Sequence, residues 1–144
     1  MANHVIYWEN VTEGSEIPPV VIELTMKRMM MAVCATRDFY PLHHDQEFAR
    51  AAGHKDIVVN VQFLEGFLGR CLTDWTGPEG KIRKLSLATT MPNYLGDTIT
   101  AKGKVSGKYV EKGNHNVDCE LVMLKQDGMV TANSRATVIL PAKS

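Results

Sequence analysis

A carboxylate and an imidazole, Asp38 and His43, lie five residues apart in one short segment of this chain. Pro41 stands between them and biases Tyr40 toward an extended conformation. The segment therefore indicates a stiff loop that holds two titratable groups at a set separation. An imidazole can give or take a proton near neutral pH, and a carboxylate beside it can share and orient a water molecule. The pattern points to general acid–base chemistry on water.

Spacing alone leaves other roles open for these residues. Asp38 could pair with Arg37 or cap a turn, with His43 as a packing residue. Asp45 stands where a helix N-cap belongs, so we expect a capping role for it. A metal site is the remaining alternative, and its possible ligands are His43, His44, Asp45, His54 and Asp56. Adjacent histidines in a loop tend to point apart, and the segment has no H-x-x-x-H pair, so we expect no metal.

The elements that must position this segment follow from the periodicity of apolar residues. Residues 13–19 are typical of a loop. Residues 20–35 alternate at Val20, Ile22 and Leu24 and predict a strand, broken near Arg28. Residues 45–52 predict a two-turn helix that Gly53 ends.

A longer helix is predicted within residues 57–75. Its apolar residues recur at steps of three and four: Phe63, Leu64, Phe67, Leu68, Cys71, Leu72 and Trp75. Gly66 and Gly69 interrupt it, and each costs about 1 kcal/mol of helix propensity relative to Ala. We expect the close approach of a sheet to compensate.

The period returns to two after Lys81, and residues 98–109, 117–125 and 130–140 predict antiparallel strands. Asp127-Gly128 predicts a type I′ turn between the last two. A curved antiparallel sheet wrapped around the long central helix would bury the helix, which predicts an α+β hot-dog fold for a single domain, residues 1–144. The exposed sheet edges and helix surface predict at least a dimer.

Composition excludes several classes of partner. The formal net charge is zero, so the chain lacks an electrostatic footprint for nucleic acid or an anionic membrane. No apolar run approaches the ~20 residues that span a bilayer, and residues 1–4 do not resemble a signal peptide. Cys34, Cys71 and Cys119 predict three reduced, buried thiols in a cytoplasmic protein.

Two motifs resemble the MaoC-like (R)-specific enoyl-CoA hydratases. That family carries D-x-N-P-x-H with an aliphatic residue before the histidine, and Asp38, Pro41, Leu42 and His43 match it, while Tyr40 replaces the Asn. Residues 92–99 look like the family's P-x-x-x-G-D turn that enters a strand. Further stretches, at residues 35–39, 43–45, 55–57, 59–60 and 73–75, are similar to the small MaoC-like subunits of heteromeric steroid side-chain hydratases.

The resemblance implies roles for named residues. Asp38 would be the main base and His43 its partner, and together they would hold the water that adds to an α,β-unsaturated acyl-CoA. The family's motif at the start of the long helix has a Gly whose N–H stabilises the enolate, and Val61 replaces it here. Asn60 and Tyr40 would also border the substrate. Asn60 has an alternative role as a polar group at the helix N-terminus.

The resemblance further implies a coenzyme A thioester as substrate, with no separate cofactor. The partner would be a second copy, giving a homodimer, or a second MaoC-like chain, giving a heterotetramer. Two alternatives stay open. One is an acyl-CoA thioesterase that uses Glu65 or Asp56, and the other is a non-catalytic subunit that supports a catalytic partner.

Overall fold

The computed structural model describes residues 5–143, so residues 1–4, on which the expectation of no signal peptide rests, lie outside it. Within this range the elements are η1 (Trp8–Asn10), β1 (Glu16–Glu23), α1 (Met26–Thr36), η2 (Pro41–His43), α2 (Gln46–Ala51), α3 (Val61–Thr76), β2 (Lys81–Thr89), β3 (Thr98–Glu111), β4 (Asn114–Lys125) and β5 (Val130–Ile139). No described helix combines the length and apolarity needed to cross a bilayer.

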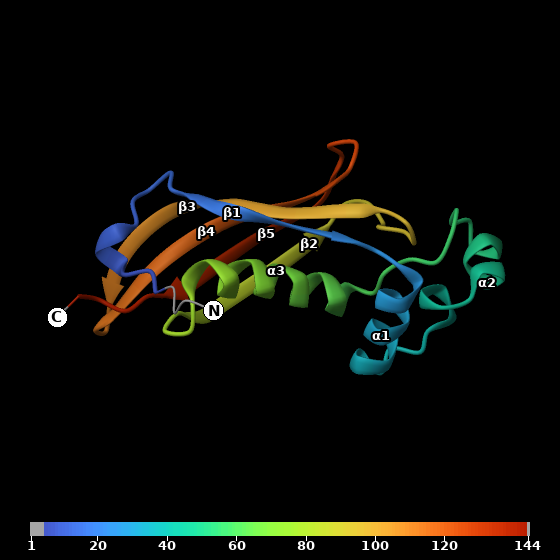
Figure 1. The fold of residues 1–144 in the computed structure, drawn as a ribbon, viewed down its shortest axis with the longest axis horizontal. Coiled ribbons are helices and arrows are strands. Elements are labelled where there is room, and N and C mark those ends of the chain that lie inside the picture. The colour runs from blue at the N-terminus through green and yellow to red at the C-terminus, as the bar shows by residue number, and fades with distance from the viewer. Residues whose placement is uncertain (1–4, 144) are drawn as a thin grey trace.

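The five strands form one antiparallel sheet in the order β1-β3-β4-β5-β2. The sheet curves over α3, and α1 and α2 lie beyond the end of α3 where that helix begins (Figure 1). This is the predicted α+β arrangement, a long helix wrapped by a curved antiparallel sheet. It places the loop between α1 and α2, which holds Asp38 and His43, near the N-terminus of α3.

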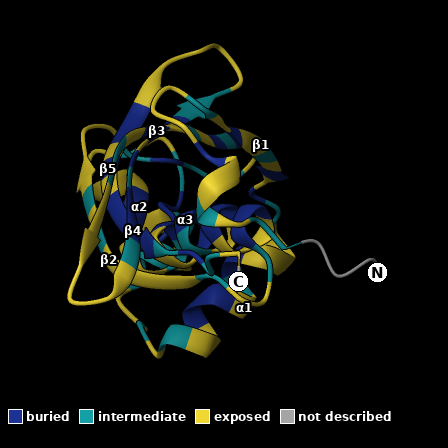
Figure 2. Cartoon of the chain, turned by 90° about the vertical axis from the view of Figure 1, so that its left-hand side faces the viewer, coloured by how far each residue is buried: buried dark blue, intermediate teal, exposed yellow. Residues whose placement is uncertain are grey.

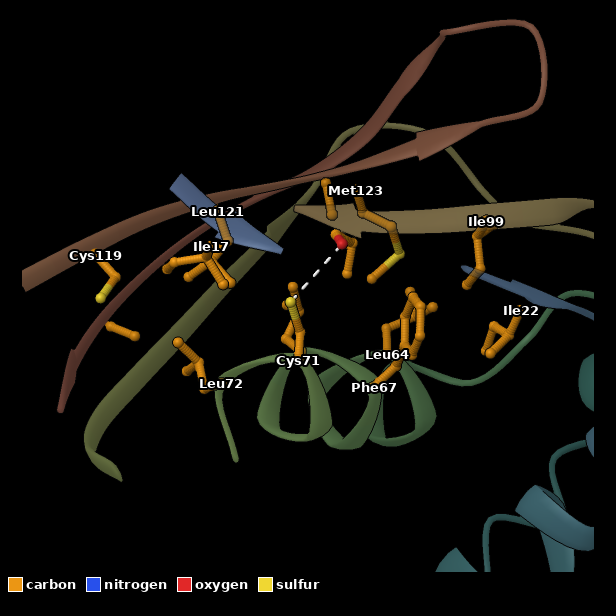
Figure 3. Close-up of a cluster of buried hydrophobic side chains, with 14 of the residues drawn as sticks. Ile17, Ile22, Leu64, Phe67, Cys71, Leu72, Ile99, Cys119, Leu121 and Met123 are labelled. Carbon is orange, nitrogen blue, oxygen red and sulfur yellow. Dashed lines mark hydrogen bonds between the residues drawn. The ribbon is translucent and has the colours of Figure 1, made fainter. Parts of the chain in front are cut away.

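The core lies between α3 and the inner face of the sheet. Figure 3 shows Leu64, Phe67, Cys71 and Leu72 of α3 directed toward the sheet residues Ile17, Ile99, Leu121 and Met123. All of these side chains are buried. The predicted apolar stripe therefore became the packed face of the helix, and the alternating strand residues became its partners.

The cysteine prediction is confirmed for two of the three thiols. Cys71 and Cys119 are buried, and burial raises the pKa of the Cys71 thiol to about 11 and that of Cys119 to about 12. The Cys71 Sγ donates to the Ala101 carbonyl at 3.7 Å. Cys34 is exposed on α1, so the expectation of burial was wrong there.

The predicted strand over residues 20–35 is wrong in its second half. β1 ends at Glu23 and α1 begins at Met26, after Thr25, whose hydroxyl accepts a hydrogen bond from the Arg28 N–H as an N-cap. The buried residues of α1, which are Met29, Ala32 and Val33, recur at steps of three and four. The predicted loop at residues 13–19 is also partly strand, since β1 starts at Glu16 and runs through Pro18 and Pro19 at a bulge. Both prolines are tolerated because β1 is an edge strand.

The long helix begins four residues later than the start of the predicted segment, at Val61. Its glycines do not mark a close approach of the sheet, so that expectation was wrong. A Cβ on Gly66 would meet nothing within 4 Å, and one on Gly69 would only touch Ile82, at 4.0 Å. Gly66 lies on the exposed side of the helix.

The hairpins differ from expectation in their turn type. Of Asp127 and Gly128, only Gly128 has a positive φ, so the turn is not type I′. The Lys112-Gly113 pair between β3 and β4 has positive φ at both residues, 50° and 78°, and is the pair that meets the type I′ requirement.

The two edges of the sheet are unlike each other. Both edge strands have a register shift, but β1 also contains Pro18 and Pro19, which have no N–H to donate. β2 has mostly exposed residues, and its ribbon is coloured largely as exposed in Figure 2. Of the two edges, β2 is the one suited to pairing with another strand.

The β3–β4 pair yields a prediction about packing. A Cβ on Gly103 would lie 2.5 Å from the Glu120 carbonyl oxygen, whereas one on Gly107 would meet its nearest neighbour at 3.9 Å. Gly103→Ala must therefore move backbone and should lower the free energy of unfolding by ~1–3 kcal/mol. Gly107→Ala is the matched control and should change it little. Urea unfolding of both variants measures the difference, and equal midpoints would contradict this account of the strand pair.

Candidate active site

The structure brings Asp38 and His43 together. The Asp38 Oδ2 lies 3.3 Å from the His43 Nε2, and the two side chains are 23% and 14% exposed. The His43 Nδ1 lies 2.7 Å from the Val58 carbonyl oxygen. Because a carbonyl can only accept, Nδ1 carries a proton in this arrangement. The Nε2 is therefore the atom at which the ring gains or loses a proton, and it faces the carboxylate.

Local backbone conformation places the Asp38 carboxylate. α1 ends at Thr36, and Arg37 adopts the left-handed conformation with a φ of 57° as its C-cap. This residue turns the chain away from the helix axis. Pro41 then opens η2, and the His43 N–H donates to the Tyr40 carbonyl at 3.0 Å. A left-handed conformation is unfavourable for a residue other than glycine, so the surrounding structure must hold Arg37 in it.

An extended segment, residues 57–59, fixes the imidazole from the other side. The Val58 N–H donates to the Leu42 carbonyl at 3.0 Å, while its own carbonyl binds the His43 ring. The neighbouring groups of the same segment bond to the chain near Tyr94: the Val59 N–H donates to the Asn93 carbonyl at 3.0 Å. Residues 57–59 therefore link the loop that holds Asp38 and His43 to the second sequence motif.

That second motif acts as a structural turn. Gly96 has a φ of 85°, which the tight turn requires, and its N–H donates to the Leu24 carbonyl. The Asp97 Oδ2 accepts from the Tyr94 N–H at 2.8 Å and lies 2.9 Å from the Lys125 Nζ. Burial would raise the pKa of Asp97, but the Tyr94 N–H, Lys125 and Lys55 outweigh it and hold that pKa below its usual value.

The lowered pKa of Asp97 predicts a pH dependence of stability. The folded state binds this proton less readily than the unfolded chain, whose Asp pKa is ~3.9. The stabilisation is therefore complete above that value and is lost as the pH falls through the lower folded-state pKa.

Asp97→Asn should lower the free energy of unfolding at pH 7 by ~2 kcal/mol, because Lys125 loses its charged acceptor. It should also flatten the acid side of the stability curve. Urea unfolding between pH 3 and pH 7 measures both effects. An acid limb that is equally steep in the variant would show that other carboxylates control it.

The N-terminus of α3 follows directly after residues 57–60. Val61 is the first helical residue, and the first N–H groups of a helix have no partner within it. They also carry the positive end of the helix dipole, so Val61 presents a donor suited to a developing anion. The Val61 side chain is itself exposed and borders a hollow of about 240 Å³ that Leu64, Met91 and Asn93 also line.

Asn60 has the capping role that was the alternative to substrate contact. Its side-chain oxygen accepts from the Phe63 N–H at 3.2 Å, and its NH₂ group donates to the Thr36 hydroxyl at 2.7 Å. Asn60 is buried, with only 2% of its surface exposed. Both polar ends are thus occupied within the protein.

Tyr40 lies at an exposed position beside the Asp38–His43 pair, which we call the dyad. Its ring lies 6.1 Å from that of His43 and 5.6 Å from that of Phe48, edge to face in both cases. Tyr40 and its neighbour Phe39 are 55% and 61% exposed. The substitution of Tyr for the family's Asn therefore adds apolar surface beside the acid–base pair.

The other polar candidates have separate positions. The Asp45 carboxylate caps α2 by accepting from the Phe48 N–H, as predicted. The His44 ring is exposed, and His54 contacts the Tyr94 hydroxyl. Asp56 accepts from Gln46 and from its neighbouring backbone N–H. Glu65 is exposed on α3.

Sequence reasoning missed two participants, Val58 and Thr36. Val58 acts through its backbone, which no side-chain motif reveals. Thr36 directly follows the segment that was predicted as strand, and only its place at the end of a helix brings its hydroxyl to Asn60.

Comparison with known proteins adds a family and relatives. The model of the MaoC like domain matches residues 12–126. The chain is 37% identical over 93 residues to the 3-oxo-4,17-pregnadiene-20-carboxyl-CoA hydratase beta subunit of Mycobacterium tuberculosis, covering 65% of this chain and 72% of that protein. It is 25% identical over 140 residues to the (R)-specific enoyl-CoA hydratase of Rhodospirillum rubrum, covering 95% and 93%.

Solved structures agree with the fold. The ChsH1-ChsH2 complex from Mycobacterium tuberculosis contains a chain that superposes with a TM-score of 0.81 at 29% identity, covering 90% of this chain and 98% of that one. The unliganded R-hydratase of Pseudomonas aeruginosa superposes with a TM-score of 0.88 at 16% identity, covering 96% and 88%. The hot-dog fold predicted from the sequence is thereby confirmed.

Proposed function

Because this chain belongs to the MaoC-like family of hydratases and dehydratases, we propose that Asp38 and His43 catalyse the hydration of an α,β-unsaturated acyl-CoA. The observation that carries the proposal is the approach of the Asp38 carboxylate to the His43 Nε2, with the opposite ring nitrogen held by Val58. Two proton-transfer groups that share one small space suit the activation of a water molecule.

In the proposed reaction, water lies between the two side chains. Asp38 takes a proton from the water as its oxygen bonds to C3 of the substrate. Asp38 then gives that proton to C2 on the same face, which completes the syn addition of one water and returns both side chains to their starting protonation states. His43 can serve as the partner because its Nε2, and not its Nδ1, faces the reacting groups and can accept a hydrogen bond that orients the water. Dehydration is the reverse of the same steps.

Negative charge develops on the thioester oxygen as C3 accepts the water. We assign its stabilisation to the Val61 N–H at the start of α3, where the helix dipole favours an anion. A backbone N–H donates whatever its side chain, so replacement of Gly by Val at this position preserves the donor. The exposed Val61 side chain then shapes the space around the thioester.

A bulky apolar acyl group fits the surface beside the dyad. Phe39, Tyr40 and Phe48 are exposed aromatic residues on the loop and on α2. The relative from Mycobacterium tuberculosis is named as a hydratase of a pregnadiene-carboxyl-CoA, which is a steroid thioester. We propose a substrate of that class for this chain.

A second MaoC-like chain is the proposed partner. One similar chain is part of the ChsH1-ChsH2 complex, and another is part of the HadBC dehydratase complex of Mycobacterium tuberculosis. The open edge at β2 and the aromatic surface near Tyr40 are the parts of this chain that a partner would cover.

Loss of either dyad side chain tests the proposal. Asp38→Asn and His43→Ala should each lower the rate of enoyl-CoA hydration ~10²–10⁴-fold, because each removes one proton-transfer group. The loss of enoyl absorbance gives the rate. It is measured for the purified chain alone and for its complex with a second MaoC-like chain.

Asp45→Asn is the matched control. It removes a carboxylate from the same loop while Asn remains a good N-cap, so its rate should equal that of the wild type. Activity that survives the loss of both Asp38 and His43 would instead favour a supporting role for this chain. Release of free coenzyme A thiol that depends on Glu65 would favour the thioesterase.

A further inference from the structure

A partly buried polar link joins the helix that leads to Asp38 with the helix that begins at Val61. The Thr36 hydroxyl donates to the Ala32 carbonyl within α1 at 2.7 Å, and it accepts from the Asn60 NH₂ group at 2.7 Å. The Asn60 oxygen in turn accepts from the Phe63 N–H in the first turn of α3. The link thus runs from backbone to backbone through two side chains.

The direction of each hydrogen bond in this link is determined by its ends. The Phe63 N–H can only donate and the Ala32 carbonyl can only accept, so the Asn60 amide and the Thr36 hydroxyl each have one possible orientation. Asn60 is 2% exposed and Thr36 is half-buried, so few water molecules can reach the Asn60 side chain to replace its partners. Such a link resists rotation of one helix end against the other.

Capping of α3 alone would not require Asn at position 60. Ser, Asp or Thr would also accept from the Phe63 N–H as an N-cap. An Asp side chain has no NH₂ to donate, and a Ser side chain is too short to span the distance to Thr36. Asn is the small capping residue that can accept at α3 and donate to α1 at once.

The position of the link relates it to the chemistry. Thr36 is two residues before Asp38, and Asn60 is the residue before Val61. We propose that Asn60 and Thr36 are positioning residues, which set the distance between the Asp38 carboxylate and the Val61 N–H. This inference rests on the proposed function, since it assigns Asp38 to the C2–C3 bond and the Val61 N–H to the thioester oxygen of one substrate. Neither positioning side chain touches the reacting atoms.

The test replaces the hydroxyl and keeps the shape. Thr36→Val removes the acceptor for Asn60, leaves the Asn60 cap on α3, and should lower kcat ~10- to 100-fold, since a misplacement of about 1 Å can cost that much. KM should stay within about twofold, because the groups that bind the remote part of the substrate are unchanged. Thr36→Ser keeps the hydroxyl and should have the kcat of the wild type.

Asn60→Ser is the reciprocal variant, since it keeps an N-cap oxygen and breaks the link. The double variant Thr36→Val/Asn60→Ser should be no slower than the slower single variant, because both remove the same interaction. If Thr36→Val does not fold, the comparison of Asn60→Ser with the wild type carries the test. Thr73→Val is the control, since Thr73 also bonds a carbonyl of its own helix, but near the C-terminus of α3.

The outcomes separate this inference from the proposed function. A wild-type rate in Asp38→Asn would overturn both. A lost rate in Asp38→Asn together with an unchanged kcat in Thr36→Val would overturn the positioning role alone. A fall in melting temperature with unchanged kcat in both link variants would show that the link serves only stability.

Discussion

The two hydrogen bonds made by the Val58 backbone hold the site together. Its N–H binds the Leu42 carbonyl, and its carbonyl binds the His43 ring. The first bond fixes the loop, and the second fixes the protonated nitrogen of the imidazole. Since α3 begins three residues later at Val61, the same short segment also sets where the helix N-terminus lies relative to the loop. Changes at Val58 would therefore affect the positions of Asp38, His43 and the Val61 N–H together, which are the three groups of the proposed mechanism.

The second motif is far from Asp38 and His43 in sequence but close to them in space, because residues 57–59 contact both the motif and the loop that holds the pair. Residues 57–59 bond to the chain around Asn93 and Leu95, and the Asp97 carboxylate holds that turn against Lys125. The lowered pKa of Asp97 keeps the carboxylate charged, so the turn stays closed under ordinary conditions. The Asp97 carboxylate therefore supports the turn that contacts residues 57–59.

The sequence predicted the features that depend on periodicity and on local turns. The inner face of α3, the strands from Thr98 onward and the cap at Asp45 all follow from short-range patterns. The helix α1 was mistaken for strand because its Val and Met residues fit both structures, and the Thr25 cap was the signal that was overlooked. The pairing of Asp38 with His43 was predictable as a hypothesis. The contacts of Val58 and Thr36 were not, because they depend on backbone atoms and on residues brought together by the fold.

Two departures of this chain from the family pattern, Tyr40 and Val61, are exposed, whereas Val58 and Asn60 are buried. The two exposed positions are those that the proposed substrate or a partner chain would border. A donor that is a backbone N–H allows this division, since the Val61 side chain can change the shape of the space without removing the hydrogen bond. In the proposed mechanism, the side chains that hold the water and transfer its proton, Asp38 and His43, thus differ from those that would border the acyl group, Tyr40 and Val61.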